Sequence, residues 1–159
     1  MWTVIDSPIG ELRLVERHDE IAAIEFSPFG DADGRVRGSR DDAHPVLVEA
    51  ARQLGAYFAR DLKEFDLPLA PVGSDFQQRV WAELRAIGYG ETASYGQVAH
   101  RIGMTNAASR AVGLANGRNP IPVVIPCHRV IGANGTLTGF AGGLPRKQKL
   151  LELEQDALF

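Results

Sequence analysis

The sequence predicts an α+β protein: a small N-terminal antiparallel sheet with one helix, then a mainly helical part that carries a helix-turn-helix and a cysteine loop. Three observations lead to this prediction. Short alternating apolar segments with tight turns fill the first 26 residues. Apolar residues at helical spacing dominate after residue 74. Between these patterns, residues 68–73 form a linker, so we expect domains at 1–70 and 74–159.

The N-terminal domain is predicted to contain an antiparallel meander and a helix. The turn at 7–10 and the other short connections favour antiparallel pairing of consecutive strands. Leu47, Leu54 and Phe58 recur at helical spacing. The expected elements are strands at 3–5, 12–14 and 21–26, an exposed loop at 30–43, a helix at 47–58 and an edge strand at 65–67.

The C-terminal domain is predicted to begin and end with a helix. Ser74 is a helix N-cap residue, and apolar side chains follow it at helical spacing as far as Ile87. The turn at 88–90 ends this helix. Pro145 fits the first position of the last helix, which carries several leucines.

Two short helices between these ends predict a helix-turn-helix. Ser94 caps the first, which runs through Ile102, and Gly103 breaks it. The second runs from about residue 106 to 115 and is closed by Gly117. A tight glycine-containing turn between short helices is typical of this motif.

Composition indicates a globular protein of a reducing compartment. The chain has 159 residues, 45% hydrophobic and 23% charged, which is enough to bury a core without disulfides. No apolar run has the length of a membrane span, and the N-terminus lacks the blocks of a signal peptide. A single cysteine fits a reducing compartment. We therefore expect a cytoplasmic location and no membrane contact.

The net charge of −3 hides an asymmetry that favours a polyanionic partner. Residues 1–74 carry fourteen acidic and eight basic side chains, whereas residues 75–159 carry six and nine. Between Thr92 and Leu151 there is no Asp or Glu, but there are seven Lys or Arg residues. A polyanion is attracted to this half of the chain; a solvated basic face without a ligand is the alternative.

The second helix of the predicted helix-turn-helix has an unusually bare surface. Ala107, Ala108, Ala111 and Ala115 leave Arg110 as its one long side chain. A small-residue face allows close approach of a backbone, either inside the protein or at a nucleic acid. The surrounding acid-free segment favours the nucleic acid.

Cys127, the single cysteine, is either a buried inert thiol or a reactive nucleophile. A nucleophilic thiol needs a base or a positive field, and His128 is adjacent in the sequence. Neighbours in an extended segment point to opposite faces, so a bridging water or a backbone bend is required. A carboxylate that orients the imidazole comes from a short set of acids. These are Asp75, Glu83, Glu91, Glu152, Glu154 and Asp156, of which Glu154 is favoured because it lies on the last helix.

The segments around Cys127 suggest a rigid pocket with a close-fitting loop. Three prolines lie between Asn119 and Cys127, and the Asn119 side chain is placed to pin this lead-in. Five glycines follow between residues 132 and 143, which allows a backbone to approach a ligand closely. Phe140 within this loop is suited to stack on a flat ring.

The chain resembles the O6-alkylguanine-DNA alkyltransferases, also called methylated-DNA–protein-cysteine methyltransferases. The resemblance covers nearly the whole chain, and IPCHRV at 125–130 is its most specific segment. The other matching segments are SPIGELRL, LGAYFARDL, DFQQRVW, GYGETASYGQVA, ASRAVGLANGRNPIP and GFAGGLPRKQKLLELE. The resemblance implies a ribonuclease H-like N-terminal domain with a structural role.

The resemblance also implies a reaction and its catalytic residues. Cys127 would take the alkyl group from O6 of an extruded guanine, once per protein molecule and without a cofactor. His128 would act as base through water and Glu154 as its carboxylate partner. Tyr95 would donate a proton or hydrogen bond to the guanine ring, and Asn119 would brace the active-site loop.

The implied partner is double-stranded DNA with O6-alkylguanine, or less well O4-alkylthymine, bound through the minor groove. We expect a monomer that can cluster on DNA, with Arg110 filling the space of the extruded nucleotide. The residues assigned to DNA contact are Ser94, Thr105, Asn106, Ala107, Ala108, Arg110, Ala111, Asn116, Gly117, Arg118 and Arg129. Those assigned to the base pocket are Tyr95, Val130, Phe140, Ala141 and Gly142.

Three features depart from the family pattern. The interval from Tyr95 to Arg110 is one residue longer than usual. Position 140 is Phe where some members have Tyr, and position 141 is Ala where some have Ser. Some relatives hold zinc in the N-terminal domain with Cys and His, but residues 1–74 contain no Cys and two His. We expect no metal.

Three other functions remain as alternatives. A non-catalytic module that binds alkyl lesions shares the fold but lacks the cysteine. A Cys-His hydrolase needs a thiol and an imidazole too, but nothing in a basic segment calls for it. A transcription factor with this motif needs sequence-specific binding and usually dimerises.

Overall fold

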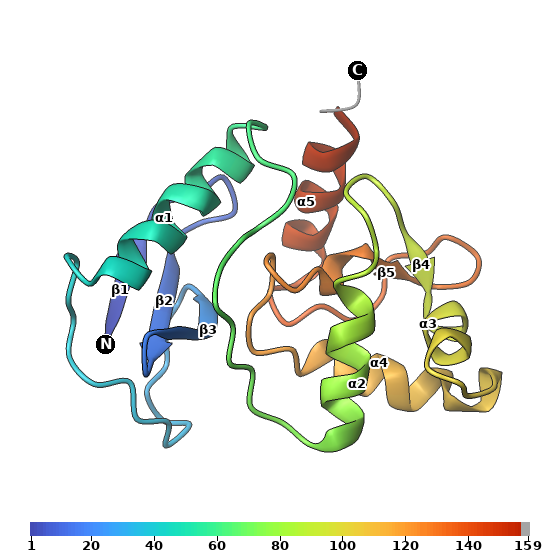
Figure 1. Cartoon of the computed structure of the whole chain (residues 1–159). Coiled ribbons are helices and arrows are strands. Elements are labelled where there is room, and N and C mark those ends of the chain that lie inside the picture. The colour runs from blue at the N-terminus through green and yellow to red at the C-terminus, as the bar shows by residue number, and fades with distance from the viewer. Residues whose placement is uncertain (157–159) are drawn as a thin grey trace. The chain divides into compact units, whose positions relative to one another are not determined.

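The computed structural model describes residues 1–156 of the chain, which form two compact units, Met1–Pro71 and a second that begins at Val72 (Figure 1). Each unit has its own secondary structure and core. Within the described residues, no helix is both long enough and apolar enough to cross a membrane.

The first unit is built on the predicted antiparallel meander (Figure 1). Its strands are β1 (Trp2–Ile5), β2 (Leu12–Arg17) and β3 (Glu20–Phe26), in the order β1-β2-β3. The turn between β2 and β3 puts His18 and Asp19 at positive φ. A register shift at Val15/Glu16 accompanies this turn. The prediction of an antiparallel sheet is confirmed.

Helix α1 (Pro45–Phe58) packs against this sheet through its apolar stripe (Figure 1). Leu47 and Leu54, whose spacing predicted the helix, are fully buried together with Tyr57, which confirms this helix. The imidazole of His44 caps the helix, since its Nδ1 accepts the N–H of Val46 at 3.3 Å.

The predicted edge strand at 65–67 is wrong. The side-chain amide of buried Gln53 accepts the N–H of Asp66 and donates to its carbonyl, both at 2.9 Å, so these backbone groups are not free to pair in a ladder. The chain pairs instead two residues later, where Leu69 forms an isolated bridge with Ile21.

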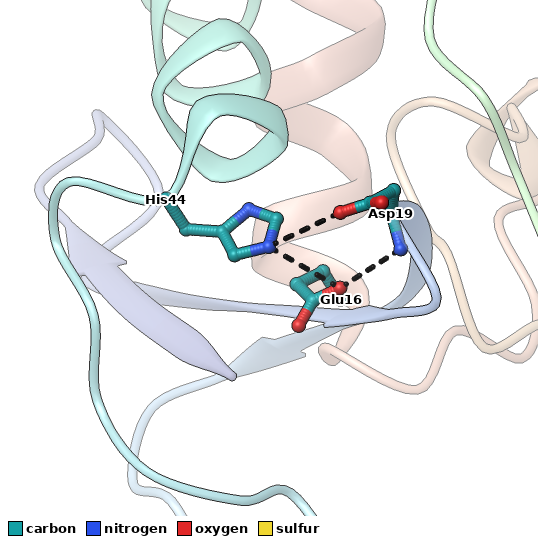
Figure 2. Close-up of side chains that lie close together, drawn as sticks. All are labelled: Glu16, Asp19 and His44. Carbon is teal, nitrogen blue, oxygen red and sulfur yellow. Dashed lines mark hydrogen bonds and ion pairs between the residues drawn. The ribbon is translucent and has the colours of Figure 1, made fainter.

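His44, Glu16 and Asp19 form a side-chain cluster that ties α1 to the β2–β3 turn (Figure 2). The donor types are those of a cation site, but hydrogen bonds within the unit already engage Glu16 and the Nδ1 of His44. Because His44 Nδ1 accepts a backbone N–H, its neutral ring carries the proton on Nε2, 3.4 Å from Asp19 and 3.6 Å from Glu16. Glu16 also accepts the Met1 ammonium at 2.9 Å and the Asp19 N–H at 3.1 Å.

The second unit is mainly helical (Figure 1). Its elements are α2 (Asp75–Leu84), β4 (Ala93–Ser94), α3 (Tyr95–Arg101), the 3-10 turn η1 (Asn106–Ala108), α4 (Ser109–Gly117), the 3-10 turn η2 (Cys127–Arg129), β5 (Val130–Ile131) and α5 (Leu144–Asp156). Helices α2 and α4 pack together around Trp81, whose indole N–H donates to the carbonyl of Ala115 at 2.8 Å. The short strands β4 and β5 pair in parallel and bring Tyr95 close to the cysteine segment.

Capping side chains begin two of these helices where the sequence predicts. Ser74 and Ser94 each form a capping box with a glutamine three residues later. Helix α2 ends at Leu84 rather than near Ile87, because the chain tightens there into 3-10 hydrogen bonds such as Ile87 N–H to Leu84 O at 3.1 Å.

The predicted helix-turn-helix is formed by α3 and α4. Gly103 adopts φ +82° in the turn, as a tight reversal requires. The chain enters α4 through η1, so the α-helix begins at Ser109 instead of 106. The side chain of Asn106 bonds His100 at 2.9 Å across the turn.

Candidate active site around the buried cysteine

Cys127 lies in the interior of the second unit. Every residue from 121 to 130 is buried, and Cys127 itself is 4% exposed. The backbone that leads to it is held by Asn119, whose amide donates to Ile125 O at 2.8 Å and accepts the N–H of Ile121 at 3.0 Å. Val123 in the same segment adopts φ +73°, a conformation that β-branched residues avoid. The lead-in is therefore a constrained loop, pinned by the side chain that was predicted to pin it.

His128 and Glu154 meet in the same interior, although 26 residues separate them. The imidazole Nε2 lies 2.7 Å from a carboxylate oxygen of Glu154, with the two side chains 0% and 1% exposed. The Arg129 guanidinium donates two hydrogen bonds to the same carboxylate, at 2.8 and 3.0 Å, and a third to Ile87 O at 2.7 Å. The last helix thus supplies the carboxylate to the cysteine turn η2.

The electrostatics of this group fix the proton positions. Burial acts to raise the pKa of Glu154, but hydrogen bonds and charge from His128 and Arg129 outweigh it and hold the pKa at about 2. Burial lowers the pKa of His128, so the ring is neutral near pH 7. A neutral ring bound to an ionised carboxylate carries its proton on Nε2. His128 Nδ1 is therefore a lone pair, and within residues 1–156 no protein group bonds it.

The thiol is protonated in the resting protein. Burial raises the pKa of Cys127 from 9.0 to about 11, and hydrogen bonding from Asn119 and the charge of Lys147 offset this only in part. Asn116 also reaches this segment, because its amide donates to the carbonyl of Cys127 at 3.3 Å. The nucleophile must accordingly lose its proton during the reaction.

Lys147 is a site residue that sequence reasoning missed. Its side chain is 0% exposed, and the ammonium donates to Val130 O at 2.6 Å and to Thr138 O at 2.7 Å. Burial lowers the pKa of Lys147, and the nearby Cys127 partly reverses this. The available signal was helical spacing, since Lys147 shares a face of α5 with Leu150 and Glu154.

The residues assigned to the base pocket lie in β5, in the loop that follows it and at the start of α3. Tyr95 is half-buried at the start of α3, and its hydroxyl bonds Thr138. Val130 is fully buried. Phe140 and Gly142 are half-buried, while Ala141 is exposed.

Most residues assigned to DNA contact form an exposed surface on the helix-turn-helix. Ser94 and Ala108 are half-buried, and the exposed members are Thr105, Asn106, Ala107, Arg110, Ala111, Gly117 and Arg118. Leu114 projects from the same helix with 63% of its surface exposed, which the sequence reasoning did not single out. We call Ala107, Arg110, Ala111, Leu114 and Arg118 the α4 surface.

Two of the residues assigned to DNA contact are placed elsewhere. Asn116 is 1% exposed and supports the Cys127 backbone. Arg129 is 6% exposed, and its guanidinium donates hydrogen bonds to Glu154 and to Ile87 O. Neither side chain faces solvent, so the structure contradicts a surface role for both.

Comparison with known families accounts for both units. The model of the 6-O-methylguanine DNA methyltransferase ribonuclease-like domain matches residues 1–71, and that of the DNA binding domain of the same methyltransferases matches residues 75–156. The chain belongs to this family. A methylated-DNA–protein-cysteine methyltransferase of Mycolicibacterium paratuberculosis is 50% identical over 97% of this chain and 92% of its own. One of Methanosarcina acetivorans is 49% identical over 96% of this chain and 97% of its own.

Solved structures of the methyltransferase family have the same fold. The crystal structure of the Mycobacterium tuberculosis O6-methylguanine methyltransferase has a TM-score of 0.89 and 47% identity, with 98% of this chain and 93% of that chain covered. A structure of the same mycobacterial protein in complex with DNA has a TM-score of 0.85, 46% identity and the same coverage.

Proposed function

We propose that this protein repairs DNA by irreversible, stoichiometric transfer of an alkyl group from O6-alkylguanine, and less well from O4-alkylthymine, to Cys127. Direct transfer to a protein cysteine is the activity of the family to which the chain belongs. The observation that carries the assignment to Cys127 is the buried relay beside this single cysteine. There an ionised carboxylate holds a neutral imidazole whose second nitrogen is bonded by no protein group among residues 1–156.

Proton removal from the thiol is assigned to His128. Its Nδ1 lone pair accepts the Cys127 proton through a water molecule, and Glu154 stabilises the imidazolium that forms. The ammonium of Lys147 lies within electrostatic range of the sulfur and favours the developing thiolate. A thiol with a pKa of about 11 is thereby ionised only when the relay and the substrate are in place.

The transfer itself is a displacement at the alkyl carbon. The Cys127 sulfur forms the new bond to carbon, the carbon–O6 bond breaks, and its electron pair remains on O6 as the guanine carbonyl. The guanine ring gains one proton from Tyr95, and the proton that Cys127 loses to His128 returns through solvent to the Tyr95 phenolate, so the thiol proton is the one that guanine gains overall. The thioether has no chemical route back, so each protein molecule reacts once.

DNA is the partner of the family, and we assign its binding to the α4 surface. Small side chains at Ala107 and Ala111 allow a helix to enter a narrow minor groove, and Arg110 is long enough to occupy the space of an extruded nucleotide. Shape and phosphate contacts carry no sequence preference, which suits repair at any site. We further propose that the protein acts in the cytoplasm as a monomer that can cluster on DNA.

Lesion binding without transfer is not favoured. Curated relatives at 49–50% identity over nearly the whole chain are named methyltransferases. The thiol also stands beside a complete relay, which a binding module does not need.

The deciding experiment is the intact mass of the protein after incubation with duplex DNA that carries one O6-methylguanine. We expect a gain of one methyl group, saturating at one per protein and located on Cys127. Cys127→Ser is the matched control and should bind the duplex without any gain in mass. A wild-type protein that binds the duplex and gains no mass would overturn the proposed function.

A further inference from the structure

Thr138 occupies a junction between the phenol and the buried lysine of the site. Its hydroxyl donates to Tyr95 Oη at 2.9 Å, and Tyr95 Oη in turn donates to the Thr138 carbonyl at 3.2 Å. The same carbonyl accepts a hydrogen bond from Lys147 Nζ at 2.7 Å. The family resemblance assigns no role to Thr138.

The lysine fixes Thr138 in place even though the threonine itself is exposed. A buried ammonium that loses an acceptor keeps its charge without a partner, which costs more than an ordinary broken hydrogen bond. Lys147 also donates to Val130 O, and Val130 pairs with Ala93 in the strand that leads into Tyr95. Thr138 and Tyr95 are thus anchored to one another through two routes.

The direction of the hydrogen bonds suits proton or hydrogen-bond donation by Tyr95. A hydroxyl that accepts a hydrogen bond is polarised and becomes a stronger donor. When Tyr95 turns its proton from the Thr138 carbonyl to a base, that carbonyl keeps its bond from Lys147 and is not left unsatisfied. The Thr138 hydroxyl meanwhile continues to hold Tyr95 Oη.

We propose that Thr138 is a positioning residue for alkyl transfer, which orients and polarises the Tyr95 hydroxyl toward the leaving guanine while Lys147 holds the Thr138 backbone. The proposal rests on the proposed function, since it concerns the rate of that transfer. It acts on the chemical step and not on DNA affinity, because neither side chain belongs to the α4 surface.

The test compares single-turnover transfer rates at saturating O6-methylguanine duplex for three variants. Thr138→Val keeps the shape and loses the hydroxyl, and we expect a rate lower by about five- to tenfold, the worth of one hydrogen bond. Thr138→Ser restores the donor and should restore most of the rate. Thr136→Val is the matched control on the same loop, because the Thr136 hydroxyl bonds only its neighbour Asn134 among the described residues, at 2.7 Å.

A double-mutant cycle separates positioning from general damage to the loop. In a Tyr95→Phe background, Thr138→Val should slow transfer no further, whereas a structural role would slow both backgrounds equally. Duplex affinity, measured by fluorescence anisotropy, should be the same for Thr138→Val and wild type. Equal rates for Thr138→Val and wild type, or equal slowing by Thr136→Val, would overturn the proposal. Failure of the wild type to gain mass would instead refute the proposed function.

Discussion

At the residue scale, the buried carboxylate of Glu154 has two tasks that mutation can separate. It orients His128 and neutralises Arg129, and both partners are buried with it. A single carboxylate therefore links the chemistry of the cysteine to the stability of the second unit.

Glu154→Gln is expected to impair both tasks. It leaves the Arg129 charge buried without an anion, so the free energy of unfolding should fall by about 3 kcal/mol or more. It also removes the charge that stabilises a His128 imidazolium, so transfer should slow by at least about tenfold. Arg129→Met is the control, because it should lower stability by a similar amount yet keep the His128–Glu154 bond. If Arg129→Met slowed transfer as much as Glu154→Gln under conditions where both are folded, the separation of tasks would be wrong.

The raised pKa of Cys127 predicts a loss of stability at alkaline pH. An acid with a higher pKa in the folded state binds its proton more tightly there, so stability is lost once the unfolded thiol ionises above about pH 9 and on toward 11. The shift from 9.0 to about 11 corresponds to roughly 3 kcal/mol when complete. Urea unfolding of wild type and Cys127→Ser between pH 7 and 10.5 should show the wild type losing stability relative to the serine variant. A constant difference would show that the thiol is not perturbed as described.

At the element scale, the helices were predictable where their signals are local. Ser74 and Ser94 predict the starts of α2 and α3, because each capping box lies within four residues of sequence. The edge strand at 65–67 failed because the buried amide of Gln53, thirteen residues earlier, binds Asp66. The strand propensity of residues 65–67 does not depend on such a tertiary contact and therefore could not predict it.

The site was predictable in its chemistry but not in its burial. Cys127, His128 and Glu154 were found from residue type and family resemblance. Which of the basic residues point inward depends on the packing of α5, so Arg129 was assigned to DNA and Lys147 was overlooked. Charge along a sequence does not tell a phosphate contact from a buried ion pair.

The α4 surface yields a prediction about Leu114. An apolar side chain that is 63% exposed on a DNA-facing helix can pack against the sugar walls of a groove. Leu114→Ala should weaken binding of an unmodified duplex by about tenfold, the worth of burying most of a leucine. Val48→Ala is the control, because Val48 is half exposed on α1 in the first unit. Anisotropy titrations that give the same affinity for Leu114→Ala and wild type would remove Leu114 from the interface.

At the scale of the whole molecule, charge is divided between the two parts of the chain. Residues 1–74 are acidic in balance and residues 75–159 basic, and the acid-free segment from Thr92 to Leu151 holds seven basic side chains. Arg129 and Lys147 are buried and cannot contact phosphates. The other five basic residues of the segment are not buried: Arg101, Arg110, Arg118, Arg146 and Lys149.

This count limits the salt dependence of DNA binding. Each phosphate neutralised contributes about −0.9 to the slope of log K against log salt concentration, so five contacts give a slope no steeper than about −4.5. Arg118→Gln should make the slope shallower by about one, because Arg118 lies exposed on the α4 surface. Arg17→Gln, an exposed change in the acidic first unit, should leave it unchanged. Anisotropy titrations at several salt concentrations measure all three slopes. A much steeper slope for the wild type, or a shallower slope for Arg17→Gln than for the wild type, would mean that phosphates are also bound outside the acid-free segment.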